Sequence, residues 1–230
     1  MAEEQAPASP APLPLADPAP LGLAGFALTT FILSVHNANW APDLIWVGLA
    51  LFYGGLAQFM AGQHEFRNRN TFGATAFSSY GAFWLALGTF VLMDLAGWVP
   101  KTLNVNNALA WFAVSFAIFN TYMLAWSTRL SKAVFAVFLT LEATLIVFFI
   151  GQFLAGSGHV MGTDLIHVSG YLGVLTAAVA WYTSAAGVIN SMTPTPFLKV
   201  GTPLWSGTIH LATDTTDRAS TGHTQPVPQH

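Results

Sequence analysis

Six apolar stretches alternate with short polar connections along this chain. They cover residues 21–35, 44–62, 72–96, 107–126, 132–154 and 165–189, and most approach the roughly 20 residues that an α-helix needs to cross a bilayer. The pattern predicts an all-α membrane protein with six transmembrane helices in a domain over residues 17–190. Residues 1–16 and 191–230, rich in Pro and small or polar residues, are predicted to be flexible cytoplasmic tails.

Composition favours the same class of protein. Apolar residues make up 53% of the chain and charged residues 7%, against roughly 25% charged in an average soluble protein. The chain has no Cys, so a disulfide or a thiolate metal site is excluded. A net charge of −3 with seven Lys and Arg is too little positive charge for nucleic-acid binding. No His, Asp and Glu set has catalytic or ligand spacing, so we expect no enzyme, metal or cofactor.

The basic residues predict how the chain is oriented in the bilayer. Lys101 alone falls on one side of the predicted spans. The other side holds the remaining six basic residues, Arg67, Arg69, Arg129, Lys132, Lys199 and Arg218. Basic residues accumulate in cytoplasmic loops, so both termini are predicted to lie in the cytoplasm, with the chain in the plasma membrane.

Small residues recur within the predicted spans. Gly54, Gly55 and Gly62 fall in the second span, and Gly81 in the third. In the sixth span Ser169, Gly173 and Ala177 are spaced by four. Such spacing lets helix backbones approach each other, within one bundle or between subunits.

The start of the first span has the pattern of a helix N-terminus. Asp17 is predicted to cap the helix, with Pro18 in its first position and Pro20 in its first turn. The unpaired N–H groups and the positive dipole end of such a start favour an anion. We expect the backbone N–H groups after Pro20, more than the Asp17 side chain, to meet an anionic ligand.

Three motifs resemble those of the acetate uptake transporter family, which includes the bacterial succinate–acetate permease and fungal acetate and ammonia-production proteins. They are Asp-Pro-Ala-Pro-Leu-Gly-Leu at 17–23, Phe-Tyr-Gly-Gly-Leu-Ala-Gln at 52–58, and Asn-Thr-Phe-Gly-Ala-Thr-Ala-Phe-Ser-Ser-Tyr-Gly-Ala-Phe-Trp at 70–84. A weaker match covers residues 166–182. The family motif usually begins with Asn, so Asp17 departs from it, and its negative charge opposes an incoming anion.

The resemblance implies a fold, an assembly and an activity. Members are six-helix proteins that assemble as hexamers, with a path through each protomer. They move acetate and related short carboxylates, in some cases succinate, by proton-linked uptake. The implied hydrophobic constriction consists of Phe26, Tyr80 and Leu141, although Leu139 or Leu145 can take the place of Leu141. The expected partners are therefore acetate-like acids, protons, the lipid bilayer and further copies of the chain.

The chemistry of the substrate predicts polar positions on either side of such a constriction. A short carboxylic acid has a pKa of about 4 and is anionic at neutral pH, and a bare carboxylate does not cross hydrocarbon without donors or protonation. Tyr80 is expected to offer its hydroxyl as a donor at the constriction. The candidate path residues are the helix start at Pro18, Pro20, Leu21 and Gly22, the hydroxyls of Thr29, Thr30 and Thr75, and the patch of His36 and Asn37.

Glu142 is an acid in the middle of the fifth predicted span. An ionised acid at the bilayer centre costs roughly 2.5–3.5 kcal/mol or more, so its side chain is expected to face the protein interior or to be protonated. Two hypotheses stay open. Glu142, with His36 as a second candidate, takes part in proton coupling, or it is a hydrogen-bonded acid at a helix or subunit contact.

The sequence therefore predicts a permease for acetate-like acids, coupled to protons. A passive anion channel with the same constriction is the nearest alternative. A membrane sensor without transport and an ammonium exporter are the more distant ones, and an ammonium path requires acceptors and aromatic cages. Substrate range, direction of flux and proton stoichiometry stay open at this point.

Overall fold

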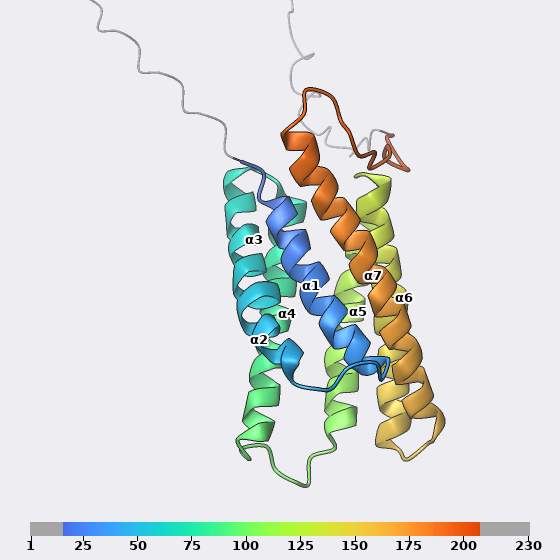
Figure 1. Cartoon of the computed structure of the whole chain (residues 1–230). Helices are drawn as coiled ribbons and strands as arrows, with labels where there is room; N and C mark the ends of the chain where they lie inside the picture. The colour runs from blue at the N-terminus through green and yellow to red at the C-terminus, as the bar shows by residue number, and fades with distance from the viewer. Residues whose placement is uncertain (1–15, 208–230) are drawn as a thin grey trace, which may run out of the picture.

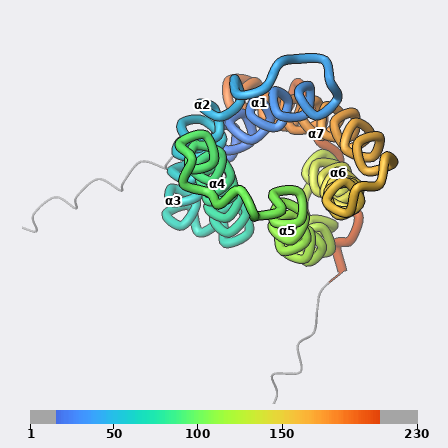
Figure 2. The backbone as a smooth tube through the Cα atoms, turned by 90° about the horizontal axis from the view of Figure 1, so that it is seen from below, coloured from blue at the N-terminus to red at the C-terminus, as the bar shows by residue number. Residues whose placement is uncertain are grey.

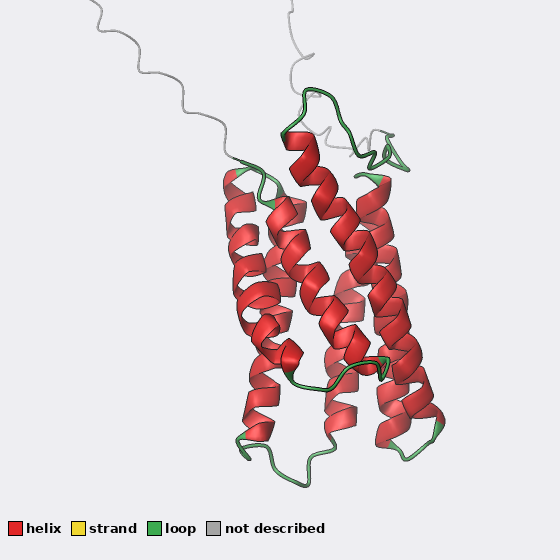
Figure 3. Cartoon of the chain, viewed as in Figure 1, coloured by secondary structure: helices red, strands yellow, loops and turns green. Residues whose placement is uncertain are grey.

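The computed structural model describes residues 16–207, and every regular element in this part of the chain is a helix (Figures 1 and 3). The elements are α1 (Ala19–Asn37), α2 (Ile45–Leu51), the π-helix η1 (Phe52–Ala57), α3 (Gln58–Arg67), α4 (Thr71–Leu95), α5 (Val105–Ser127), α6 (Lys132–Gly156) and α7 (Met161–Ser191). Because α2, η1 and α3 are continuous, six helical segments are long and apolar enough to cross a membrane. The six predicted spans are confirmed.

The cap of the first helix lies one residue later than predicted. Pro18 occupies the N-cap position that the sequence assigned to Asp17, and α1 starts at Ala19. Asp17 still satisfies a free donor, because its Oδ1 accepts a hydrogen bond of 2.9 Å from the Ala19 N–H. The 19 residues of α1 reach roughly 28 Å at 1.5 Å per residue, close to the thickness of the hydrocarbon core.

The helices form a ring around a central axis (Figure 2). Close neighbours around it are α5 and α6, α6 and α7, α7 and α1, and α3 and α4, while α2 and η1 lie between α1 and α4. The pair α4 and α5 is not among the closely packed backbones. The start of α1 and the end of α7 lie at the same end of the bundle, as an even number of spans requires (Figure 1).

The sequence did not predict the π-helical turn η1 in the second span. Gly54 of this turn and Gly25 of α1 let the two helices approach closely: a Cβ at Gly25 would lie 2.6 Å from the Tyr53 carbonyl oxygen, and one at Gly54 2.5 Å from Thr29 Oγ1. A π-turn changes the direction of the side chains that follow it, and such turns occur frequently at functional sites. Gln58 is the first residue after the π-helical turn η1.

Glycines also mediate the other close helix contacts, which confirms the packing role predicted for small residues. A Cβ at Gly81 of α4 would lie 2.6 Å from the backbone nitrogen of Phe59 in α3. Gly62 of α3 lies against Ser78 of α4, and Gly173 of α7 against Ser34 of α1. These pairs hold the backbones at a distance that no larger side chain permits.

Large apolar side chains remain exposed along the outside of the helices. Phe52 is 70% exposed, Trp98 75% and Trp111 63%. A monomeric soluble protein rarely exposes so much apolar surface, whereas in a bilayer it contacts lipid, with Trp enriched at the interfaces. Trp46 differs, because it is buried against α4.

The chain after α7 packs back onto the bundle. The Val200 carbonyl accepts from the Ala133 N–H (2.9 Å), and the Thr128 carbonyl accepts from the N–H groups of Leu204 (2.9 Å) and Trp205 (3.0 Å). The guanidinium of Arg129 lies 4.6 Å from the Trp205 ring centroid. Residues 192–207, which belong to the predicted tail, therefore contact the bundle through backbone pairing and a ring contact. Residues 1–15 and 208–230 lie outside the described part of the chain.

Candidate functional site

The three residues implied for the constriction meet in the centre of the ring. Phe26 comes from α1, Tyr80 from α4 and Leu141 from α6, and all three belong to one buried apolar cluster. The Phe26 and Tyr80 rings contact each other edge to face, with centroids 5.7 Å apart and planes at 62°. This geometry is the favourable one for two aromatic quadrupoles.

Two cavities lie along the bundle axis, one on each side of these three side chains. The upper cavity, of about 100 Å³, lies toward the start of α1 and is bounded by residues such as Leu23, Phe77 and Val134. The lower cavity, of about 70 Å³, extends the other way between residues such as Leu33, Leu109 and Phe148. About 10–15 Å³ of such space holds one water molecule, so either cavity can hold a small solute.

Among residues 16–207, Phe26, Tyr80 and Leu141 are the only ones that line both cavities. The two spaces therefore meet at these side chains, which separate them. Among the three leucines considered from sequence, Leu139 is 48% exposed and Leu145 lines the lower cavity alone. Leu141 thus has the position between the cavities that the resemblance implies.

One face of α1 follows the whole path. Leu23, Phe26, Thr30, Leu33 and Asn37 line the cavities, and their spacing of three or four residues places them on one side of a helix. The predicted path residues Thr30 and Asn37 lie on this face, in the lower cavity. The Thr30 hydroxyl is buried and has no hydrogen-bond partner in the protein.

Other predicted path residues lie away from both cavities. Thr29 packs against Gly54 of η1, and Gly22 packs against the Phe77 ring while its N–H donates to the Pro18 carbonyl (3.2 Å). Pro20 and Leu21 border a separate hollow beside α7 that shares no residue with the upper cavity. Pro18 and Thr75 line neither cavity.

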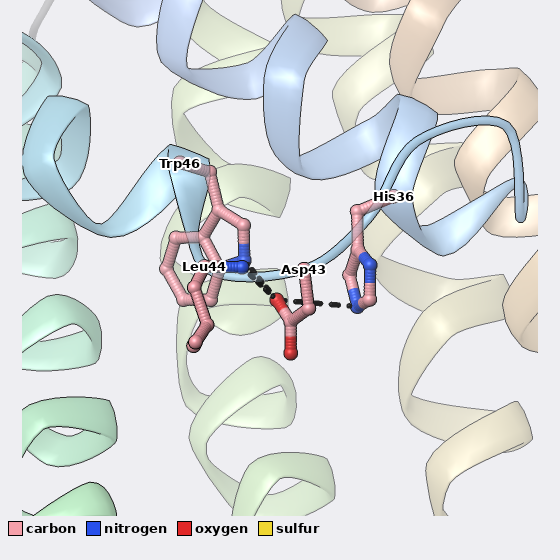
Figure 4. A network of polar contacts seen from close by, with 4 residues as sticks. All are labelled: His36, Asp43, Leu44 and Trp46. Atoms are coloured by element: carbon pink, nitrogen blue, oxygen red, sulfur yellow. Dashed lines mark hydrogen bonds and ion pairs between the residues drawn. The ribbon is translucent and has the colours of Figure 1, made fainter.

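His36 belongs to a polar network in the connection after α1 (Figure 4). Its Nε2 lies 3.5 Å from Asp43 Oδ1, an oxygen that also accepts from the Leu44 N–H and the Trp46 Nε1–H, each at 2.7 Å. The His36 side chain is 32% exposed and lines neither cavity. The structure therefore gives His36 a role in shaping this connection.

The Tyr80 hydroxyl takes part in a buried network that the sequence analysis missed. It donates a hydrogen bond of 2.6 Å to Oδ1 of Asn120 on α5, a side chain with no exposed surface. Asn120 Nδ2 donates in turn to the Phe138 carbonyl (3.0 Å) and to Glu142 Oε2 (2.6 Å) on α6. The expectation that Tyr80 offers a free donor is wrong for this conformation, because Asn120 accepts its proton.

Glu142 lies between α5 and α6 and lines neither cavity. Its Oε1 accepts from the Thr121 hydroxyl (2.7 Å), so both of its oxygens have a donor on α5. Of the two hypotheses left open by the sequence, this geometry favours the hydrogen-bonded helix contact. The signal for Asn120 was present in the sequence, as a lone Asn inside an apolar span.

The polar side chains of the upper cavity were also missed. Gln58 and Glu65 of α3 and Asn70, which caps α4, all line it. Gln58 and Glu65 are each 1% exposed, and one oxygen of each has no hydrogen-bond partner in the protein. The signal available in the sequence was Glu65, an acid in the last turn of the second span. Among residues 16–207, no three His, Asp or Glu side chains gather as metal ligands.

Comparisons with known proteins identify relatives of this chain. The family model described as the GPR1/FUN34/yaaH family matches residues 3–201. The Saccharomyces cerevisiae protein named Ammonia transport outward protein 2 is 38% identical over 190 residues, which are 78% of this chain and 64% of that protein. The chain thus spans slightly less than two thirds of the yeast relative's length.

Other relatives match over more of their length. Acetate permease A of Emericella nidulans is 35% identical over 88% of this chain and 72% of its own. The Escherichia coli K12 protein named Succinate-acetate/proton symporter SatP is 35% identical over 81% of this chain and 96% of its own. A solved structure, described as that of the bacterial acetate channel SatP, superposes with a TM-score of 0.75 at 34% identity and covers 82% of this chain and all of the other.

Proposed function

Because the chain belongs to the GPR1/FUN34/yaaH family, we propose that it carries acetate and related short-chain carboxylates across a membrane. The observation that carries this proposal is the arrangement of two cavities that meet at Phe26, Tyr80 and Leu141. Two family relatives are named for acetate transport, and the resemblance carried by the motifs at 17–23 and 70–84 points to the same substrate class.

The path suits a small acid that crosses the constriction in a dehydrated state. Polar side chains lie in both cavities, and apolar side chains dominate the point where they meet. A narrow apolar segment can close by dewetting, while the cavities beside it stay accessible to a polar solute. An anion crosses such a segment at a high free-energy cost, so we include proton-coupled uptake in the proposal.

Further parts of the proposal concern assembly, location and coupling. The chain forms a homo-oligomer, a hexamer by resemblance, in the plasma membrane, with both termini in the cytoplasm. Exposed apolar side chains along the helices and the distribution of basic residues support this arrangement. Glu142 and His36 were the candidates for proton coupling from the sequence, and neither lines a cavity.

The test is acetate flux in proteoliposomes that contain the purified full chain. We expect labelled acetate to enter, and to accumulate above its equilibrium level when a pH gradient is imposed. Equilibration without such accumulation identifies a passive channel, and no flux at all refutes the proposed function. Lactate and succinate in the same assay define the substrate range.

A variant pair tests the constriction in that assay. Leu141→Ala widens the point where the cavities meet and should lower the free-energy barrier to acetate. A barrier that is lower by about 1.4 kcal/mol raises flux about tenfold. Leu139→Ala makes the same chemical change on an exposed surface of the same helix and should leave flux unchanged. Equal flux in both variants argues against Leu141 as part of the constriction.

A further inference from the structure

Glu65 is a buried acid that faces the upper cavity and has no assigned role. It lies in α3, is 1% exposed, and its Oε1 is buried without a hydrogen-bond partner. Gln58 lies seven residues earlier, two helical turns away on the same face, and its Oε1 is also without a partner. Two unpaired acceptors therefore line the space that the permeating molecule enters from the constriction.

No cation compensates Glu65 within the described residues. The only ion pair there joins His36 and Asp43, at the other end of α1. On its own helix His64 and Arg67 are exposed to the outside.

Among residues 16–207, the other elements around the upper cavity form no ion pair with Glu65 either. The start of α1 contributes Asp17, a like charge, and the start of α4 contributes Asn70, a neutral amide that interacts with the Glu65 carboxyl group and leaves its charge uncompensated. From the connection before α6, Arg129 donates to the Gly207 carbonyl and stacks on Trp205, and the Lys132 side chain packs against Gly201. A buried carboxyl group in these surroundings favours a ligand that brings a hydrogen-bond donor.

We propose that Glu65 exchanges a proton with the carboxylic acid that passes through the upper cavity. This inference rests on the proposed function and assigns a residue to its proton coupling. The neutral acid carries the O–H donor that the unpaired Glu65 Oε1 lacks, whereas the acetate anion carries none. The neutral acid is also the form that crosses the constriction at the lower free-energy cost.

The exchange is balanced in atoms and charge. The O–H bond of the bound acid breaks, its electron pair stays on the acid's oxygen, and the proton binds Glu65 Oε1. The negative charge passes from Glu65 to the acetate, which the Gln58 amide can stabilise by donating through Nε2. Both groups are carboxyls of similar chemistry, so the proton can pass in either direction as the gradient dictates.

Glu65→Gln separates this role from a structural one, because it keeps the shape of the side chain and removes the exchangeable proton. Two readouts are needed in proteoliposomes with the full chain: accumulation of labelled acetate driven by a pH gradient, and exchange of labelled for unlabelled acetate at equal pH. We expect accumulation in Glu65→Gln to fall about tenfold or more, with exchange within about twofold of the unmodified chain.

Two further variants make the result decisive. Asp164→Asn removes an exposed acid at the start of α7, outside both cavities, and should change neither readout. Glu65→Asp keeps a carboxyl group and should retain part of the accumulation that Glu65→Gln loses. Unchanged accumulation in Glu65→Gln overturns the proposal. The proposal is also overturned if accumulation and exchange fall to the same extent in both Glu65→Gln and Glu65→Asp. An unmodified chain without acetate flux instead refutes the proposed function.

Discussion

The two faces of α4 are packed in different ways. Toward α3, Gly81 lies against the Phe59 backbone and Ser78 against Gly62, so the two backbones touch. Toward α5 the backbones stay apart, and aromatic rings pack between part of the two helices, beside a hollow of about 300 Å³ bounded by Phe90 and Ala108. Phe83 stacks on Phe112 at 5.1 Å between centroids, and Tyr80 contacts Phe119 at 5.4 Å.

The proposed constriction therefore lies on the side of α4 whose contacts are made by rotatable side chains. A glycine contact has no side chain to rotate, so α3 and α4 act as one rigid wall. A gap filled by rings opens when one ring changes rotamer, without movement of the backbone. On that side a single buried side chain, Asn120, joins Tyr80 to both α5 and α6 by hydrogen bonds.

The largest effect is expected where the rigid wall is disturbed. Gly81→Ala places a Cβ 2.6 Å from the Phe59 nitrogen, and such overpacking costs about 1–3 kcal/mol. The variant should unfold at a lower temperature in detergent, as followed by Trp fluorescence.

Gly48→Ala is the matched control for this change. No atom lies within 4 Å of a Cβ at Gly48, and replacing Gly by Ala within a helix gains up to about 1 kcal/mol. Equal unfolding temperatures for the two variants would show that α3 and α4 are not held by this contact.

The second prediction concerns the movable side. Asn120→Leu removes the hydrogen-bond acceptor of Tyr80 and the donor to Phe138 and Glu142, and an unsatisfied buried polar group costs about 1–3 kcal/mol. With its hydroxyl released, the Tyr80 ring should leave the constriction more often. We expect acetate flux to rise about two- to tenfold, since 1.4 kcal/mol corresponds to a factor of ten.

Thr121→Val is the control for Asn120→Leu. It removes the Thr121 bond to Glu142 and leaves the bond between Tyr80 and Asn120 in place. Flux in Thr121→Val should stay close to that of the unmodified chain. A lower flux in Asn120→Leu, or equal rises in both variants, contradicts a holding role for Asn120.

The two faces also show what the sequence can predict. The apolar runs determine the six spans, and glycine spacing indicates close backbone contacts, because both depend on local composition. The motifs around Phe26 and Tyr80 imply these two constriction residues by resemblance, and the structure brings both into one buried cluster. Which neighbouring side chains reach the cavities depends on helix rotation, since adjacent residues diverge by about 100°. Thr30 therefore lines the lower cavity while Thr29 packs against η1.

Long-range polar contacts are less accessible to sequence reasoning. The role of Asn120 depends on how α4, α5 and α6 are aligned with one another. Tyr80 lies 40 positions before Asn120 in the chain. Gln58 faces the upper cavity after a π-turn that no apolar pattern reveals. Glu142 attracted interest as the acid at the centre of a span, whereas Glu65, nearer a span end, is the one that lines a cavity.

The smallest effect is expected for Glu142→Gln, because this change keeps the hydrogen bonds around Asn120. The Gln oxygen can accept from Asn120 Nδ2, and its amide can donate to the Thr121 hydroxyl, which then donates to the Ala117 carbonyl 2.9 Å away. Acetate flux and accumulation driven by a pH gradient should stay within about twofold, since Tyr80 keeps its acceptor. Accumulation that is lost while exchange persists would instead assign proton coupling to Glu142, and would place the coupling group on the movable side of the constriction.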